Sequence, residues 1–177
     1  MNLETQLSLH CFLLTHSYGD RNGRFVITLE ARAQQGHRVH ILINTFRPLF
    51  FVPRDTPESL TSEATERKHL ALKAMDGTPV DCLYFSRLRE CRNCAQTLRA
   101  DGIRTFESDI HPVERYLMER FVTGSFVVEG IAQRRGNTYN FFNPRIRGMD
   151  AEVSLSVLSF DIETCTRTGE LYSIAAD

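Results

Sequence analysis

Apolar and polar residues alternate in the first third of the chain, and this spacing limits the possible folds more than any other feature. Val39, Ile41 and Ile43 recur at every second position. That period places their side chains on one face of a β-strand. Comparable runs, separated by turns at 17–23 and 34–37, cover residues 7–16, 24–32, 38–46 and 49–52. Consecutive strands joined by short turns predict an antiparallel meander or a small barrel.

The middle third has a different pattern. Residues 55–76 are polar and predict an exposed excursion that carries a helix over 63–75. The segments that follow predict a strand, a helix, a second strand and a second helix, over residues 80–85, 87–100, 103–107 and 113–121. A β-α-β unit of this kind is half of a ferredoxin-like unit. The predicted fold class is therefore α+β, rich in antiparallel strands.

The last third returns to strand patterns. Strands are predicted over 125–130 and 138–142, around a hinge at 133–137 and before a linker at 143–150. A further strand over 153–163 and its partner over 170–175 form a hairpin at the end of the sequence. A lone two-stranded hairpin cannot bury both of its faces. We therefore expect the chain to belong to something longer, with this hairpin packing on the preceding domain or on a neighbouring copy.

The composition is that of an ordinary globular protein. The 177 residues are 42% hydrophobic and 24% charged, with a net charge of −1. No apolar run reaches the roughly 20 residues of a membrane span, and no secretion signal opens the chain. We expect no membrane partner and a cytoplasmic protein. The five cysteines then suggest free thiols, and the Cys91–Cys94 pair is expected to be structural rather than redox-active or zinc-binding.

Asp161 and Glu163 are the sharpest local feature. Side chains two positions apart on a strand share one face, about 7 Å apart. Two such carboxylates can bind a divalent cation, and a pair of cations can activate water and hold both oxygens of a phosphodiester. This chemistry needs more carboxylates than these two. The alternative is a solvated acidic strand end, since motifs this short recur by chance.

Arginines and aromatic residues alternate over residues 134–147. This combination suits a single-stranded nucleic acid, in which phosphates bind arginine and bases stack on rings. The alternative is a hairpin with its rings in the core and its arginines in solvent. The candidate nucleic-acid contacts are Arg134, Arg135, Tyr139, Phe141, Arg145 and Arg147.

Two segments resemble family B DNA polymerases, most closely their bacterial branch. Residues 103–122, IRTFESDIHPVERYLMERFV, resemble the segment that closes the family's N-terminal domain. Residues 156–164, SVLSFDIET, followed by GELYSI at 169–174, resemble the first motif of its 3′–5′ proofreading exonuclease. The order and spacing of the two segments also fit this family.

The resemblance implies a division of the chain. Residues 1–148 would be the polymerase N-terminal domain, a scaffold on the template side. Residues 149–177 would begin an RNase H-like exonuclease domain with its first β-hairpin. Asp161 and Glu163 would then be metal ligands and catalytic residues that share two Mg²⁺ ions with aspartates from later motifs.

The resemblance also implies what the whole protein does. The complete enzyme would extend primers on a DNA template and trim 3′ ends, and its partners would be DNA and the rest of the polymerase chain at the bacterial nucleoid. The 177 residues alone would be inactive and would bind Mg²⁺ weakly, since half of the ligand set is missing. Two alternatives remain: a stand-alone single-strand-binding module, and a small metal hydrolase built on Asp161 and Glu163.

Overall fold

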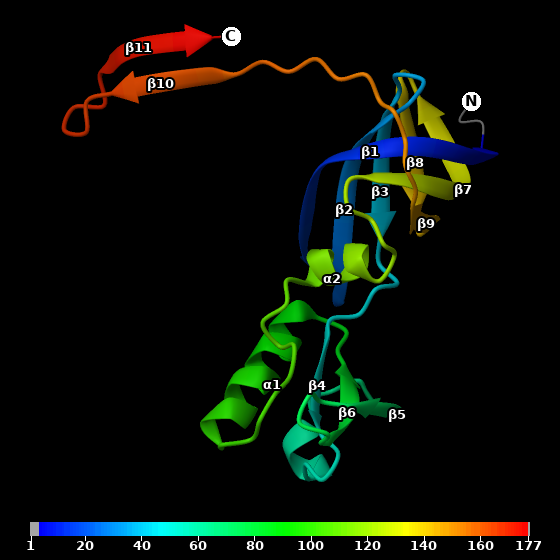
Figure 1. The fold of residues 1–177 in the computed structure, drawn as a ribbon, viewed down its shortest axis with the longest axis vertical. Coiled ribbons are helices and arrows are strands. Elements are labelled where there is room, and N and C mark those ends of the chain that lie inside the picture. The colour runs from blue at the N-terminus through cyan, green and yellow to red at the C-terminus, as the bar shows by residue number, and fades with distance from the viewer. Residues whose placement is uncertain (1–3, 177) are drawn as a thin grey trace.

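The first three strands form a meander. The computed structural model describes residues 4–176, and its ribbon begins with β1 (Glu4–Arg21), β2 (Arg24–Ala33) and β3 (Arg38–Ile43) (Figure 1). The expected loop over 17–23 is wrong except at its end, because β1 continues to Arg21. Asn22 and Gly23 alone make the turn, with φ of 49° and 76°. Two consecutive positive φ angles match the right-handed twist of the flanking strands, which Asn-Gly tolerates well.

Two later strands close this meander into a barrel. β7 (Ser125–Arg135) pairs with β8 (Thr138–Phe142), and β8 runs parallel to β3. β1 pairs with β2 through its second half and with β7 through its first half. The resulting order, β1-β2-β3-β8-β7 and back to β1, is that of a five-stranded OB-type barrel.

A sixth strand lies outside this ring. β9 (Arg145–Gly148) pairs with β7, so the linker predicted over 143–150 is wrong over these four residues. The hinge predicted over 133–137 is wrong up to Arg135, which still belongs to β7. Ile146 is buried against the barrel core, and this burial stabilises the short strand.

The alternating apolar residues of the strands fill the barrel. Ile27, Leu29, Ile41, Val128 and Phe141 belong to one buried cluster. The helix α2 (Pro112–Met118) adds Val113 and Tyr116 to this cluster, and so covers one end of the barrel. Helix α2 is shorter than the predicted 113–121 and begins with Pro112, a residue whose fixed φ suits a first helical turn.

A smaller unit is inserted between β3 and α2. It has its own buried cluster around Phe50, Leu83, Phe85 and Leu98. Its three strands have the order β4-β6-β5. Its elements are β4 (Leu49–Pro53), the 3₁₀ helix η1 (Glu58–Thr61), β5 (Glu66–Lys73), β6 (Pro79–Tyr84) and α1 (Leu88–Ala100).

Two predictions for this unit are wrong. The helix expected over 63–75 is strand β5, which pairs with β6 and so satisfies the backbone of that buried strand. The strand expected over 103–107 makes only one bridge, between Phe51 and Phe106, and the positive φ of 57° at Glu107 ends its extended course. The expected half of a ferredoxin-like unit is therefore incomplete, whereas the strand-rich α+β class is confirmed.

The chain then leaves the barrel and forms a separate hairpin. β10 (Phe160–Thr164) pairs with β11 (Leu171–Ala176). The expected strand over 153–163 is wrong over 153–159, which has no regular structure and follows an extended course away from the barrel (Figure 1). Every described hairpin residue except Cys165 is exposed, so the expected packing of the hairpin on the preceding domain is also wrong.

Asp81 holds the sheet of the small unit together. Its side chain is 0% exposed and accepts hydrogen bonds from Arg54 Nε at 3.0 Å and Arg67 Nε at 3.0 Å. His69 Nδ1 lies 2.9 Å from the same carboxylate. Burial alone would raise the pKa of Asp81, but the hydrogen bonds from these three residues hold the pKa below its usual range.

Asp81→Asn should lower the free energy of unfolding at pH 7 by about 3 kcal/mol. The substitution removes the buried negative charge that Arg54, Arg67 and His69 surround, and leaves these side chains without their carboxylate partner. The folded state has the lower pKa, so this contribution is complete above the unfolded value and declines from about pH 4 downward. Urea unfolding at pH 7 and at pH 3 measures both effects. Asp55→Asn is the control, since Asp55 is exposed in the same unit. Equal stability of the two variants at pH 7 would contradict this role for Asp81.

Gly148 marks a close approach of two backbones at the end of β9. Its N–H donates to Arg120 O at 2.7 Å, and a Cβ at Gly148 would lie 1.8 Å from Phe121 O. Gly19, in β1, has no neighbouring atom within 4 Å of the equivalent position.

Gly148→Ala should therefore lower the free energy of unfolding by about 1–3 kcal/mol, because backbone atoms must move apart. Gly19→Ala is the matched control and should stabilise the strand by about 0.5 kcal/mol or leave it unchanged. Denaturant unfolding of both variants measures the difference. A neutral Gly148→Ala variant would show that β9 does not pack this closely.

Candidate functional site

The hairpin places Asp161 and Glu163 on one face. Asp161 lies opposite Ala175 and Glu163 opposite Ser173, in an antiparallel register that stays regular until Glu163. Both carboxylates are exposed, and the backbone N–H of Ile162 donates to Asp161 Oδ1 at 2.9 Å. The spacing predicted this shared face, and both side chains are accessible to solvent.

The donor set of this hairpin is incomplete for a metal centre. Within residues 4–176, no group of three or more His, Cys, Asp or Glu side chains is arranged to hold an ion. Two carboxylates can supply two of the oxygen ligands that Mg²⁺ takes, but a site with two cations needs more. Asp161 and Glu163 therefore fit part of a magnesium site, and any other ligands have to come from outside this hairpin.

Cys165 lies in the turn that follows the two acids. Its N–H donates to Glu170 O at 2.8 Å, and its carbonyl accepts from Gly169 N at 2.8 Å. Hydrogen bonding from the Thr168 side chain, and then from Tyr172, lowers the pKa of Cys165 to about 6. The other four cysteines are buried.

Cys165 should react first with iodoacetamide at pH 7, because most of it is thiolate at that pH while burial raises the pKa values of the other thiols. The labelling rate should reach half its maximum near pH 6, measured by mass spectrometry of the labelled peptides. Thr168→Val should move this midpoint upward, and Cys165→Ser should remove the label. Earlier labelling of a buried cysteine would contradict this assignment.

Cys91 and Cys94 are free and buried in α1, as thiols with a structural role would be. Burial raises the pKa of Cys91 to about 12 and that of Cys94 to about 11. Both therefore stay protonated at neutral pH and pack as small apolar side chains.

The structure divides the 134–147 stretch between the core, the end of the barrel and the outside. Phe141 is only 2% exposed and belongs to the barrel core, so its prediction as a nucleic-acid contact is wrong. Arg135 is exposed at the end of β7, and Arg145 and Arg147 are exposed on β9. These three arginines stay candidate contacts for nucleic acid.

Arg134 and Tyr139 contact each other at the end of the barrel. The guanidinium carbon of Arg134 lies 5.5 Å from the centre of the Tyr139 ring, and His37 meets the same ring edge-on at 5.2 Å. Arg134 Nε also donates to Gly136 O at 3.1 Å. These contacts stabilise the β7–β8 turn and leave Arg134 exposed, so both residues remain candidates.

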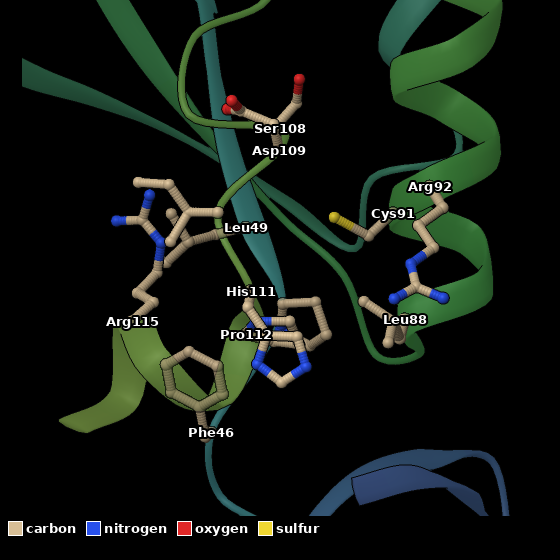
Figure 2. A pocket seen from close by; sticks show the side chains of 12 residues that line it. Phe46, Leu49, Leu88, Cys91, Arg92, Ser108, Asp109, His111, Pro112 and Arg115 are labelled. Carbon is tan, nitrogen blue, oxygen red and sulfur yellow. The ribbon is translucent and has the colours of Figure 1, made fainter. Parts of the chain in front are cut away.

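A pocket of about 120 Å³ lies between the barrel and the small unit (Figure 2). Phe46, Leu49 and Leu88 line it together with His111 and Arg115. His111 Nδ1 is buried in the pocket wall without a hydrogen-bond partner among the described atoms. The lining mixes apolar side chains with polar and charged ones, and the volume is below the roughly 300 Å³ at which small-ligand sites begin.

Sequence reasoning missed this pocket, and it also missed Arg32 and Arg38. His111 and Arg115 lie within the segment that resembles family B polymerases, but nothing local indicates that Phe46 and Leu88 approach them. Arg32 and Arg38 lie about 100 residues before Arg135, and only the parallel pairing of β3 with β8 brings them together. No signal in the linear sequence reports that pairing.

The fold is that of a known polymerase region. No family model matches the chain. The structure of the family B DNA polymerase from the hyperthermophilic archaeon Pyrobaculum calidifontis matches 95% of this chain with a TM-score of 0.72 and 18% sequence identity. The chain covers 25% of that polymerase. At this identity the match shows the fold alone.

A bacterial relative gives a closer match in sequence. DNA polymerase II of Escherichia coli K12 is 40% identical over 109 residues, which are 61% of this chain and 13% of the polymerase. The chain therefore spans only a small part of the length of this relative, a member of the kind of polymerase that the sequence resembles. Among the described residues, no helix has the length and apolar character needed to cross a membrane.

Proposed function

We propose that the chain is the N-terminal region of a family B DNA polymerase that copies a template and proofreads with a 3′–5′ exonuclease. The observation that carries this proposal is the 40% identity to DNA polymerase II of E. coli, in a chain whose fold matches an archaeal family B polymerase over 95% of its length. DNA and the rest of the polymerase chain are then its partners, and the protein acts at the bacterial nucleoid.

We assign residues 1–148 to the N-terminal domain and 149–177 to the start of the exonuclease domain. The exposed course of the chain after Gly148 supports this boundary. β9 is also the last strand that pairs with the barrel, whereas β10 pairs only with β11. The barrel and the small unit form the scaffold on the template side.

In the exonuclease, Asp161 and Glu163 act as two of the carboxylate ligands. Bound Mg²⁺ ions would supply an activated water and stabilise the oxygens of the scissile phosphate. The two carboxylates lie on the same face of β10, so that both can reach one bound cation. Because the set is incomplete, the 177 residues alone are expected to release no nucleotides with Mg²⁺ or Mn²⁺.

The test uses the full-length protein that contains these residues. Asp161→Ala and Glu163→Ala should each lower 3′–5′ degradation of a mismatched primer by at least about 100-fold, because each removes a metal ligand. Primer extension by the same variants should stay near the wild-type rate. Both activities are measured on one labelled primer–template with and without nucleotides.

Glu170→Ala is the matched control, since Glu170 is an exposed acid in the turn of the same hairpin. Its nuclease activity should equal that of the wild type. Unchanged nuclease activity in the Asp161 and Glu163 variants would overturn their assigned role. Absence of primer extension by the full-length wild type would overturn the polymerase proposal itself.

A second candidate is a stand-alone module that binds single-stranded nucleic acid. The closed five-stranded barrel favours it, because OB-type barrels bind oligonucleotides on one face of the barrel. The two proposals differ in whether the longer protein extends primers. A small metal hydrolase has no further support, because within residues 4–176 no three His, Cys, Asp or Glu side chains are arranged to hold an ion.

A further inference from the structure

We infer that the outer face of β2, β3, β8 and β7 binds a single-stranded nucleic acid, whose phosphates bind Arg32, Arg38 and Arg135. These three residues are called the arginine row below. This inference deepens the proposed function, on which it rests for the identity of the ligand. It replaces the continuous 134–147 stretch by residues from three strands.

The strand register puts the row together. Arg32 of β2 lies directly opposite Arg38 of β3. Arg38 lies beside Thr138 of β8, and Thr138 lies opposite Arg135 of β7. Directly paired residues share a face, and the neighbouring inward residues Ala33 and Val39 are buried. The three arginines therefore lie on the outside of the barrel, along a line about 15 Å long across four strands.

The row is short of negative charge. Like charges directly opposite each other destabilise a sheet, and Arg32 and Arg38 form such a pair. None of the three makes an ion pair with a carboxylate between residues 4 and 176. The nearest acid along this face, Glu30, is engaged by His40, with Nδ1 and Oε1 2.5 Å apart. An anion bound at the row would relieve the repulsion.

On the same outer face, next to the arginine row, lie side chains that could contact the bases of a bound strand. The next row of paired residues is polar and consists of Glu30, His40, Asn140 and Gln133. Beyond it Leu42 pairs with Phe142, whose ring is 62% exposed. An exposed ring can stack on an unpaired base, whereas the bases of a duplex are already stacked on each other. This arrangement favours a single strand over a duplex.

A groove lies along the β2 side of the row. It has a volume of about 640 Å³, and its lining includes Arg32, Arg38 and the His40-paired Glu30 on the barrel side, together with Ser154 and Ser156 of the segment after the barrel. The β2–β3 turn closes one end with Gly36, whose positive φ of 84° keeps the turn tight next to the Arg32 guanidinium. OB-type barrels use this second and third strand as their binding surface. The groove gives an extended chain a path past two of the three arginines.

The test measures binding of a fluorescein-labelled oligothymidine to the 177-residue protein. Combined Arg32→Ala, Arg38→Ala and Arg135→Ala substitutions should weaken binding at least 10-fold at about 100 mM salt. The slope of log affinity against log salt should fall in magnitude by about 2, since each lost phosphate contact removes about 0.7. Fluorescence anisotropy at several salt concentrations gives both values.

The matched control removes the same charge elsewhere, by Arg21→Ala, Arg89→Ala and Arg99→Ala. These arginines are exposed and make no ion pair among the described residues. The control should bind nearly as tightly as the wild type. A Lys variant at all three row positions should keep most of the salt slope, and thermal unfolding checks that every variant is folded.

Phe142→Ala tests the stacking part separately. It should weaken binding about 5-fold or more and leave the salt slope unchanged, because a ring binds bases and not phosphates. A labelled duplex of the same length should bind less tightly than the single strand. Tighter binding of the duplex, equal losses in the row and control variants, or no loss in the row variant would each overturn the inference.

The same row variant in the full-length protein separates this inference from the proposed function. Wild-type primer extension together with unchanged single-strand binding by the row variant would overturn the row and leave the polymerase proposal intact. If the full-length wild type extends no primer, and the row variant still loses single-strand binding, the polymerase proposal is overturned and the arginine row is kept. Each proposal can therefore fail alone.

Discussion

The barrel is closed by one long strand that has two partners. β1 is 18 residues long and pairs with β7 over Glu4–Phe12 and with β2 over Cys11–Arg21. The two pairings overlap at Cys11 and Phe12, and the register with β2 shifts between Leu13 and Thr15, just after the pairing with β7 ends. Without this double pairing β2 and β7 would both be open edges. The parallel pairing of β3 with β8 depends on that closure. The outer face that carries Arg38 and Thr138 therefore depends on it too.

The positions of arginines in this fold explain why a net charge near zero says little about its partners. Arg54 and Arg67 are used within the small unit, where they satisfy the buried carboxylate of Asp81. Arg115 similarly pairs with Glu107 at the end of the segment that leads into α2. Arg32 and Arg38 have no such carboxylate among the described residues, and on the outside of the barrel Arg38 is exposed and Arg32 half-buried. An electrostatic surface for an anionic partner is therefore made by arginines that the fold does not use.

The parts that could be predicted from the sequence depend on local periods. Alternation at Val39, Ile41 and Ile43 identified β3, and the Asn22–Gly23 pair marked a turn because few residues adopt two positive φ angles. The face shared by Asp161 and Glu163 also follows from a period of two. The polar sequence of β5 predicts a helix with a weak apolar face, whereas pairing with β6 fixes the segment as a strand.

Features set by contacts far along the chain could not be predicted. β9 is a strand only because β7 offers it an edge, although its own sequence contains Pro144 just before it and Gly148 at its end. The pocket brings Phe46 to His111, 65 positions later, and β3 pairs Arg38 with Thr138, 100 positions later. Register is a property of two strands together, so the sequence of either strand alone does not contain it.

The hairpin links metal binding to the burial of its other face. Asp161 and Glu163 share one side of β10, and Phe160 and Ile162 project from the opposite side with Ile174 of β11. All of these side chains are exposed, and two strands alone are marginally stable in water. A metal site needs its ligands held within about 0.5 Å of the working geometry. Contacts that cover Ile162 and Ile174 would therefore fix the two carboxylates as well, so that packing of the apolar face and binding of the cation stabilise each other.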